Sequence, residues 1–222
     1  MKQFNHVGTK KPIPKLERVT RPDGTRYYVT PEGNKYPSVT TILSLHNKEG
    51  LIEWRKKVGE AEANRISKAA AGRGTRLHNI VEKYINNEDC DIQNPFDLKN
   101  FLSIQPILEN IDNVHCQEQQ MYSNHLRLSG TVDCIGEYKG KLAVIDFKTS
   151  SRRKEKDHIH SYFMQCAAYS IMYEEMTGVP INRLVIIISV ENDYPQVFFE
   201  KRDNWVKYLL LYRNEYERLT SA

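Results

Sequence analysis

Residues 130–150, GTVDCIGEYKGKLAVIDFKTS, decide the fold and raise the question of function. The segment reads as two β-strands joined by a tight turn at Lys139 and Gly140. Each strand carries one aspartate, Asp133 or Asp146, among residues typical of a buried strand. A buried carboxylate is costly unless a positive group meets it, so the fold must bring positive charge to both side chains.

The alternation of side chains along the second strand places Asp146 and Lys148 on the same face. The short turn permits a register that sets Asp133 beside Asp146. Two carboxylates next to one ammonium are costly as scaffolding, because one lysine cannot neutralise both, whereas a divalent cation such as Mg²⁺ (or Mn²⁺) can. The alternative is an Asp146–Lys148 ion pair on an edge strand, with Asp133 in solvent.

The first half of the chain predicts a small hairpin followed by helices. Turn signals at residues 21–24 and 31–34 flank the hairpin, and Ser38 or Thr40 can cap a short helix after it. The later elements of this half are a helical region over 51–84 with breaks near Gly59 and at 72–74, a loop over 86–100, and a helix over 101–111.

The second half predicts a sheet with helices, and the whole chain therefore predicts an α/β fold. The expected strands are 114–123, 126–138, 141–150, a strand apolar on both faces at 183–190, and an edge strand at 196–201. We expect Asp157 to cap a long helix that runs to about Thr177 and ends at Gly178. Asp203 can cap a closing amphipathic helix.

The composition, with 40% hydrophobic and 27% charged residues among 222, is typical of a soluble protein with one substantial core. No run approaches the about 20 apolar residues of a membrane span, and the opening lacks the apolar segment of a secretion signal. We therefore expect a cytoplasmic protein, since Pro12 and Pro14 disfavour an organelle transit helix. The cysteines form no CxxC pair and are expected to be reduced, packed thiols: Cys90, Cys116, Cys134 and Cys166.

The net charge of +4 is concentrated at the start of the chain. Residues 1–30 hold seven basic and two acidic side chains, a net charge of +5. Such an arm suits a polyanionic partner such as nucleic acid. A solvated tail that aids solubility would have the same charge, so both interpretations stay open.

The spacing of the polar residues resembles the PD-(D/E)XK nuclease superfamily. D-x12-D-F-K-T, from Asp133 to Thr149, is similar to its core motif. Further matches to its RecB-like branch are G-x-x-x-H ending at His78, the acidic residue Glu118, and Q-x-x-x-Y at Gln165 and Tyr169. Within that branch YPSVTTIL, residues 36–43, resembles the N-terminal signature of mitochondrial genome maintenance exonucleases and phage exonucleases. The resemblance spans roughly residues 27–173.

The resemblance implies a restriction-endonuclease-like core, with a central mixed β-sheet flanked by helices and a helical N-terminal lobe. Asp133 and Asp146 would bind the metal, with His78 and the backbone carbonyl of Phe147 as further ligands. Lys148 would position the attacking water or stabilise developing charge.

Other positions carry further implied roles and two departures from the family pattern. Glu118 would belong to the catalytic site, and Gln165 and Tyr169 would orient Lys148 or the scissile phosphate. Val132 stands where the superfamily has its proline. No cysteine follows Cys166, so the iron–sulfur cluster of some relatives is not expected.

Residues 51–76 are basic, with an aromatic side chain among the cations, which suits a single-strand channel. The expected DNA-binding residues are Trp54, Arg55, Lys56, Lys57, Arg73 and Arg76, with Thr149 and Ser150 after the catalytic strand. A charged outer face is the alternative, because Glu53, Glu60 and Glu62 lie in the same segment.

We therefore expect one nuclease domain over 1–222, with a basic arm and hairpin (1–50), a helical lobe (51–112) and a catalytic core (113–222). The expected function is a metal-dependent DNA exonuclease, acting as a monomer on free ends of single-stranded DNA in replication, recombination or repair. The phage-like resemblance favours a bacterial or phage-infected cell. The alternatives are a structure-specific or restriction-type endonuclease and a non-catalytic DNA-binding module. The intact set of Asp133, Asp146 and Lys148 argues against the binding module.

Overall fold

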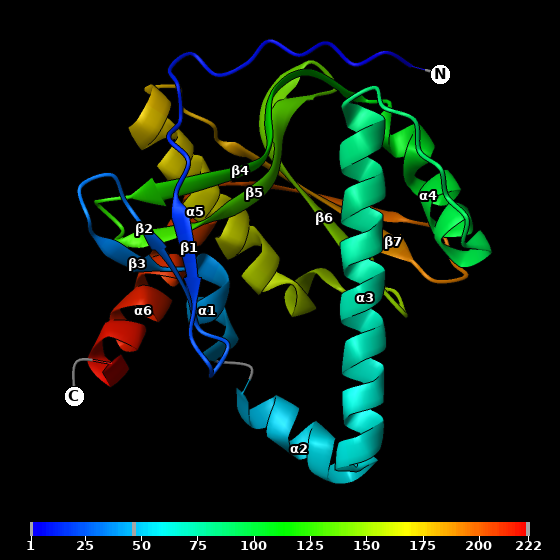
Figure 1. Ribbon diagram of the computed structural model, residues 1–222, viewed down its shortest axis with the longest axis horizontal. Coiled ribbons are helices and arrows are strands. Elements are labelled where there is room, and N and C mark those ends of the chain that lie inside the picture. Colours follow the sequence, from blue (N-terminus) through cyan, green and yellow to red (C-terminus); the bar gives the residue numbers. More distant parts are fainter. Residues whose placement is uncertain (1, 46–47, 221–222) are drawn as a thin grey trace.

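A five-stranded mixed sheet forms the centre of the protein in the computed structural model, which describes residues 2–45 and 48–220 (Figure 1). The strand order follows the chain: β4 (Ile111–Ser123), β5 (Leu128–Tyr138), β6 (Lys141–Ser150), β7 (Arg183–Val190) and β8 (Gln196–Lys201). Only β6 and β7 pair in parallel; the other neighbours are antiparallel. The mixed sheet flanked by helices confirms the predicted α/β class.

The tight turn at Lys139 and Gly140 sets the register of the β5–β6 hairpin. Both residues have left-handed backbone conformations, with φ of 52° and 70°, as the favoured two-residue hairpin turns require. Cys134 therefore lies opposite Ile145. The parallel pair β6–β7 needs a crossover, which α5 (His160–Thr177) supplies before ending at Gly178 with φ of 77°.

Helices cover both faces of the sheet. On one face α5, α6 (Asp203–Thr220) and α1 (Val39–Ser44) pack with Ile135, Val144 and Ile186 in one apolar cluster. On the other face α3 (Glu60–Ile85) and α4 (Pro95–Leu108) pack with Cys134, Ile145 and Val185 in a second. β7 is buried on both faces, as its continuous apolar run predicts.

The start of the chain is an ordered segment along the edge of β4. Val114 N donates a hydrogen bond of 2.8 Å to Asn5 O, and Val7 N donates one of 2.9 Å to Val114 O. Phe4 is buried in the second cluster, and Lys2 pairs with Asp112. The expected hairpin is a three-stranded antiparallel sheet: β1 (Glu17–Thr20), β2 (Arg26–Val29) and β3 (Lys35–Pro37).

The helical region differs from its prediction at two places. Ser38 caps α1 as expected, and Gly59, with φ of 89°, separates α2 (Lys48–Val58) from α3. The break predicted at residues 72–74 is wrong, because α3 continues through both glycines on the strength of its packed face at Leu77 and Val81. Figure 1 shows α2 and the first half of α3 extending away from the central sheet.

Two further boundaries were predicted wrongly. The loop expected over 86–100 ends earlier, because Asn94 caps α4 and accepts hydrogen bonds from the backbone N–H groups of Phe96 and Asp97. Asp157 does not cap α5; it lies in a short 3₁₀ turn (Lys156–His158), and α5 begins at His160 without a side-chain cap.

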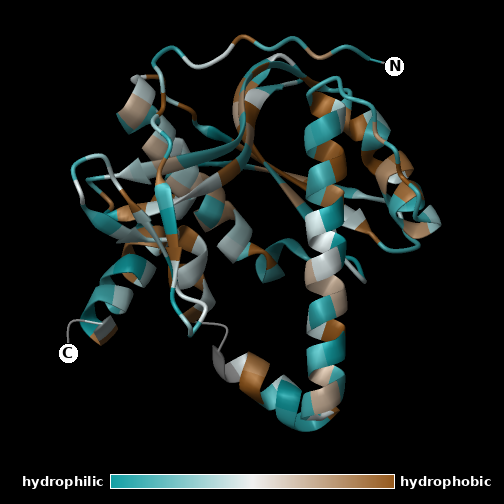
Figure 2. Cartoon of the chain, in the orientation of Figure 1, coloured by the Kyte–Doolittle hydropathy of each residue, from teal (hydrophilic) through white to brown (hydrophobic). Residues whose placement is uncertain are grey.

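Hydrophobic and hydrophilic residues alternate along α3 in Figure 2, as in a helix that buries one side. No helix in the described ranges is long and apolar enough to cross a membrane.

Gly130 on β5 is required by the close approach of α5, and its replacement tests this packing. A Cβ atom there would lie 2.8 Å from Cε1 and 2.8 Å from Oη of Tyr169, whose ring is buried. We expect Gly130→Ala to destabilise the protein by about 1–3 kcal/mol through overpacking. Gly72→Ala is the control, since its Cβ would meet only the flexible end of Arg76, and Ala is the better helix former. Equal melting temperatures for the two variants would contradict the packing argument.

Candidate active site

The two aspartates of the hairpin converge below the protein surface. Asp133 on β5 is 9% exposed and Asp146 on β6 is 1% exposed. Asp133 Oδ2 accepts a hydrogen bond of 2.9 Å from the backbone N–H of Phe147, which joins the two strands at this level. β6 lies between β5 and β7. The alternative of an edge strand with a solvated Asp133 is therefore wrong.

Lys148 forms a close ion pair with the Asp146 carboxylate. Its Nζ donates a hydrogen bond of 2.6 Å to Oδ1 and lies at 2.6 Å from Oδ2. The second oxygen is buried and accepts no geometrically sound hydrogen bond from the described residues. The single ammonium lies between two buried carboxylates and cannot neutralise both, so additional positive charge would be stabilised at this place.

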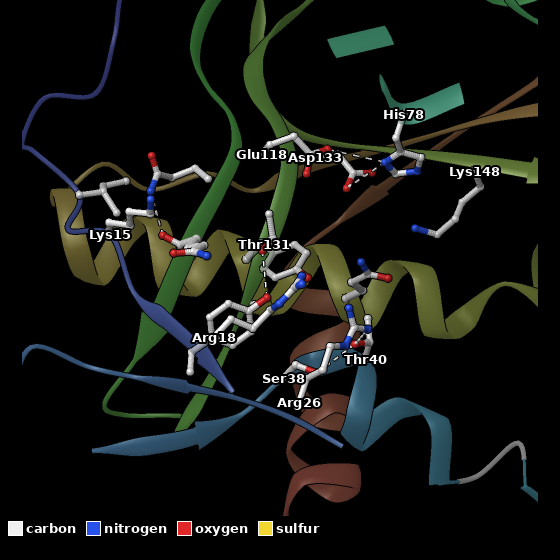
Figure 3. Close-up of a pocket in the computed structure, with 17 residues that line it drawn as sticks. Lys15, Arg18, Arg26, Ser38, Thr40, His78, Glu118, Thr131, Asp133 and Lys148 are labelled. Atoms are coloured by element: carbon white, nitrogen blue, oxygen red, sulfur yellow. Dashed lines mark hydrogen bonds and ion pairs between the residues drawn. The ribbon is translucent and has the colours of Figure 1, made fainter. Parts of the chain in front are cut away.

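His78 reaches the same place from α3. Its Nε2 lies 2.8 Å from the backbone carbonyl oxygen of Phe147, and its Nδ1 lies 3.7 Å from both Asp133 Oδ1 and Glu118 Oε1. Figure 3 shows the side chains of His78, Glu118 and Asp133 turned toward one another. The Phe147 carbonyl, an expected metal ligand, is thus occupied by the imidazole.

Glu118 lies on β4 with a left-handed backbone, φ of 44°. That conformation costs a non-glycine residue about 1–2 kcal/mol. It persists because the neighbours on both sides are paired with β5, Gln117 with Cys134 and Gln119 with Val132. Strain of this kind is concentrated at functional sites in proteins.

The electrostatics of the site favour added positive charge. Burial raises the pKa of Asp133, and burial together with the Asp133 carboxylate raises the pKa of Asp146 to about 6, against the opposing effect of Lys148. Burial lowers the pKa of His78, but Glu118, Asp133 and Asp146 outweigh it and raise the pKa to about 9. Protonated His78 therefore supplies positive charge that the carboxylates demand, and a metal ion bound by Nδ1 would replace that proton.

The donor atoms fit a divalent cation. One ligand atom from each of His78, Glu118 and Asp133 lies within 4.8 Å of the others. Asp146, on the neighbouring strand, lies outside this group of three and would share its carboxylate between Lys148 and the ion. Carboxylate oxygens are the ligands that Mg²⁺ and Mn²⁺ prefer. The residues present could therefore hold such an ion. Glu118, which the sequence predicts only as a catalytic-site residue, would then be a metal ligand.

Helix α5 lines the site from the opposite side. Gln165 and Tyr169 border the same cavity as Lys148 and Asp133. The ring that contacts Lys148 is Tyr162, whose centroid lies 5.2 Å from Nζ and provides a cation–π contact. Sequence analysis missed Tyr162, although it lies three residues before Gln165 and shares its helix face.

The expected DNA-binding cations of the helical region are largely engaged elsewhere. Arg55 pairs with Glu60, Arg73 with Glu191, and Arg76 with Asp97. The other expected residues lie outside the cavity. On α2, Trp54 is half-buried and Lys56 and Lys57 are exposed. After the catalytic strand, Thr149 lies near Gly74, and the Ser150 hydroxyl donates a hydrogen bond to the backbone carbonyl of Arg152. Besides Lys148, the lysines and arginines that line the cavity are Lys15, Arg18 and Arg26, which belong to the basic arm but were not predicted as site residues.

Comparison with known proteins agrees with the geometry. Residues 95–207, just over half of the 222, match the sequence model of the PD-(D/E)XK nuclease superfamily. The chain therefore belongs to this superfamily, whose members generally use divalent metals. The matched span contains the Asp133, Asp146 and Lys148 set, whereas His78 lies before it.

Two curated relatives are vertebrate proteins named mitochondrial genome maintenance exonuclease 1. The protein of Xenopus tropicalis is 29% identical over 174 residues, which cover 72% of this chain and 50% of that protein. The protein of Homo sapiens is 30% identical over 150 residues, which cover 61% of this chain and 43% of that protein. The chain thus spans about half the length of the curated relatives it matches.

Metal addition should stabilise the folded protein if this cluster binds the ion. At a hundredfold excess of Mg²⁺ or Mn²⁺ over its dissociation constant, we expect about 2.7 kcal/mol of stabilisation relative to chelator, which is roughly 5–10 °C in melting temperature. Asp133→Asn should lose the shift. Asp157→Asn, which alters a carboxylate whose side chain is 93% exposed, should keep it. A full metal shift in Asp133→Asn would remove this aspartate from the metal site.

Proposed function

We propose that this protein is a metal-dependent DNA exonuclease that hydrolyses phosphodiester bonds from free ends of single-stranded DNA. The observation that supports it best is the meeting of Asp133, Asp146 and Lys148 in the buried hairpin, with His78 and Glu118 beside Asp133. A site with these groups is suited to phosphoryl chemistry because carboxylates hold a cation and a lysine faces the developing negative charge.

A divalent ion, when bound, would supply activation of water and neutralisation of charge on the phosphate. Asp133, Asp146, Glu118 and His78 would hold it. Lys148 is held by the Asp146 carboxylate and by the Tyr162 ring, so its ammonium is already oriented before substrate arrives. Such preorganisation lowers the cost of reorganisation during the reaction.

The exonuclease activity and the DNA substrate are inferred from the relatives, whose name describes exonucleases in genome maintenance. A role in DNA replication, recombination or repair is part of the same proposal. The proposed preference for a single strand is supported by the corner formed by α2 and α3. This corner extends beyond the sheet and carries exposed lysines that can contact a DNA backbone (Figure 1). Monomeric state, cytoplasmic location and the one-domain division of the chain stay predictions.

Substitution of Asp146 separates catalysis from binding. We expect Asp146→Asn to lower the cleavage rate of linear single-stranded DNA by a hundredfold to a thousandfold or more. Binding of the same DNA should stay within a few-fold of wild type or strengthen, because one negative charge facing the phosphate is removed. The measurements are initial rates in Mg²⁺ and dissociation constants in chelator.

A melting curve must accompany this variant, because breaking a buried ion pair can cost about 3–5 kcal/mol. Asp157→Asn is the matched control and should cleave like wild type. If folded Asp146→Asn cleaves at the wild-type rate, Asp146 has no part in the reaction.

The topology of the substrate distinguishes exonuclease from endonuclease. We expect digestion of linear single-stranded DNA from its termini and little attack on blunt duplex. A covalently closed single-stranded circle should survive, because a strand that must enter the site by its end needs a free end to be cut. Electrophoresis of labelled linear and circular strands measures this. Rapid nicking of the circle would replace the exonuclease by the endonuclease alternative.

A further inference from the structure

A cavity of about 680 Å³ joins the catalytic residues to the small N-terminal sheet. One part of its wall holds His78, Glu118, Asp133 and Lys148. Another part holds Lys15, Arg18 and Arg26, together with Ser38 and Thr40. Figure 3 shows the two groups on different sides of Thr131. Both carboxylates lie on one side (the acidic side), next to His78 and Lys148, whereas the side with Lys15, Arg18 and Arg26 (the basic side) holds no acidic residue among the described residues that line it.

The small sheet directs its cations into this cavity by strand register. Arg18 on β1 lies opposite Tyr28 on β2, and Arg26 shares the Tyr28 face because it is two residues away. The hydroxyl of Tyr28 lies 3.0 Å from Thr131 Oγ1 and ties this face to β5. The adjacent acidic residue Glu17 points to the other face of β1.

These cations have no acidic partner. Within residues 2–45 and 48–220, Lys15, Arg18 and Arg26 form no ion pair, in contrast to Arg55, Arg65, Arg73 and Arg76 of the helical region. Unpaired cations collected in a cleft raise the local concentration of anions. Their charge is therefore available to a ligand.

Among the described residues, Arg26 is the one of the three whose side chain donates a hydrogen bond to the protein. Its Nη2 donates a hydrogen bond of 2.7 Å to Thr40 Oγ1, and Thr40 is in turn 3.0 Å from the Ser38 hydroxyl. The guanidinium is held through one nitrogen, which leaves other N–H groups for a planar, two-point contact. Phosphate oxygens are the anions that this geometry matches.

We propose that Arg26, with Arg18 and Lys15, binds an internal backbone phosphate of the substrate strand next to the phosphate that is cleaved. The inference rests on the proposed nuclease function and adds a second phosphate subsite to it. The basic side of the cavity holds one phosphate, which delivers its neighbour in the chain to the acidic side. Because the two sides differ in charge, a bound strand cannot exchange the phosphates that they hold. The subsite therefore also fixes the position of the strand in the cavity.

The test combines a protein variant with a neutral linkage at a single site in the DNA. Single-stranded oligonucleotides carry one methylphosphonate at successive positions, and their dissociation constants are measured with Asp146→Asn protein and with the double variant Asp146→Asn, Arg26→Gln. We expect the methylphosphonate at one position to weaken binding to Asp146→Asn protein about tenfold. The same oligonucleotide should bind the double variant with little further loss, because the arginine that contacts that phosphate is already absent. Arg26→Gln should also flatten the salt dependence by about 0.7.

Control variants distinguish a local contact from a general charge effect. Arg218→Gln removes an exposed arginine of α6 outside the cavity and should change neither quantity. Arg18→Gln removes an exposed side chain without a protein partner, so it keeps the test informative if Arg26→Gln is unstable.

Three results would overturn the proposal. Wild-type binding by both arginine variants excludes the subsite, and an equal loss at every linkage position makes the attraction diffuse. A loss confined to oligonucleotides with a terminal phosphate monoester assigns the cavity to a strand end instead. Cleavage by the wild-type protein is measured in parallel. If the wild type cleaves DNA but Arg26→Gln does not weaken binding, only the subsite proposal fails. If the wild type does not cleave DNA, the proposed function itself fails.

Discussion

The hydrogen bond from the Phe147 amide to the Asp133 carboxylate is the contact on which the site depends. It lies where β5 separates from regular pairing with β6, and it holds a buried charge at that point with a backbone donor. Asp146 and Lys148 then follow on the next strand by alternation, and His78 bonds to the carbonyl of the same Phe147 residue. One peptide segment of β6 thus sets the position of four polar side chains.

The strands and the hairpin were predictable because their signals are local. Alternation, the Lys139–Gly140 turn and the apolar run of β7 each report on neighbours in sequence. The continuation of α3 through residues 72–74 was not predictable in this way. Two glycines weaken a helix locally, but burial of Leu77 and Val81 against the sheet outweighs them, and that burial is a tertiary effect.

The same contrast between local signals and tertiary contacts holds for the residues of the site. The motif spacing selected Asp133, Asp146, Lys148 and His78, which the structure brings together. Tyr162 and the cations of the small sheet escaped notice because their importance comes from contacts between distant segments. The charge of the helical region was misleading for a related reason: a sequence counts basic residues but does not show which ones an acid has already neutralised, as Glu191 does for Arg73.

The length of α3 has a mechanical consequence. His78 is 18 residues beyond the start of the helix at Glu60, which corresponds to about 27 Å along its axis. No break interrupts the helix between them, so one continuous element joins the corner with α2 to the imidazole. A displacement of that distant corner would therefore be transmitted along the helix axis toward His78 and the carboxylates it faces. The outer corner and the candidate reaction centre thus share a single element of secondary structure.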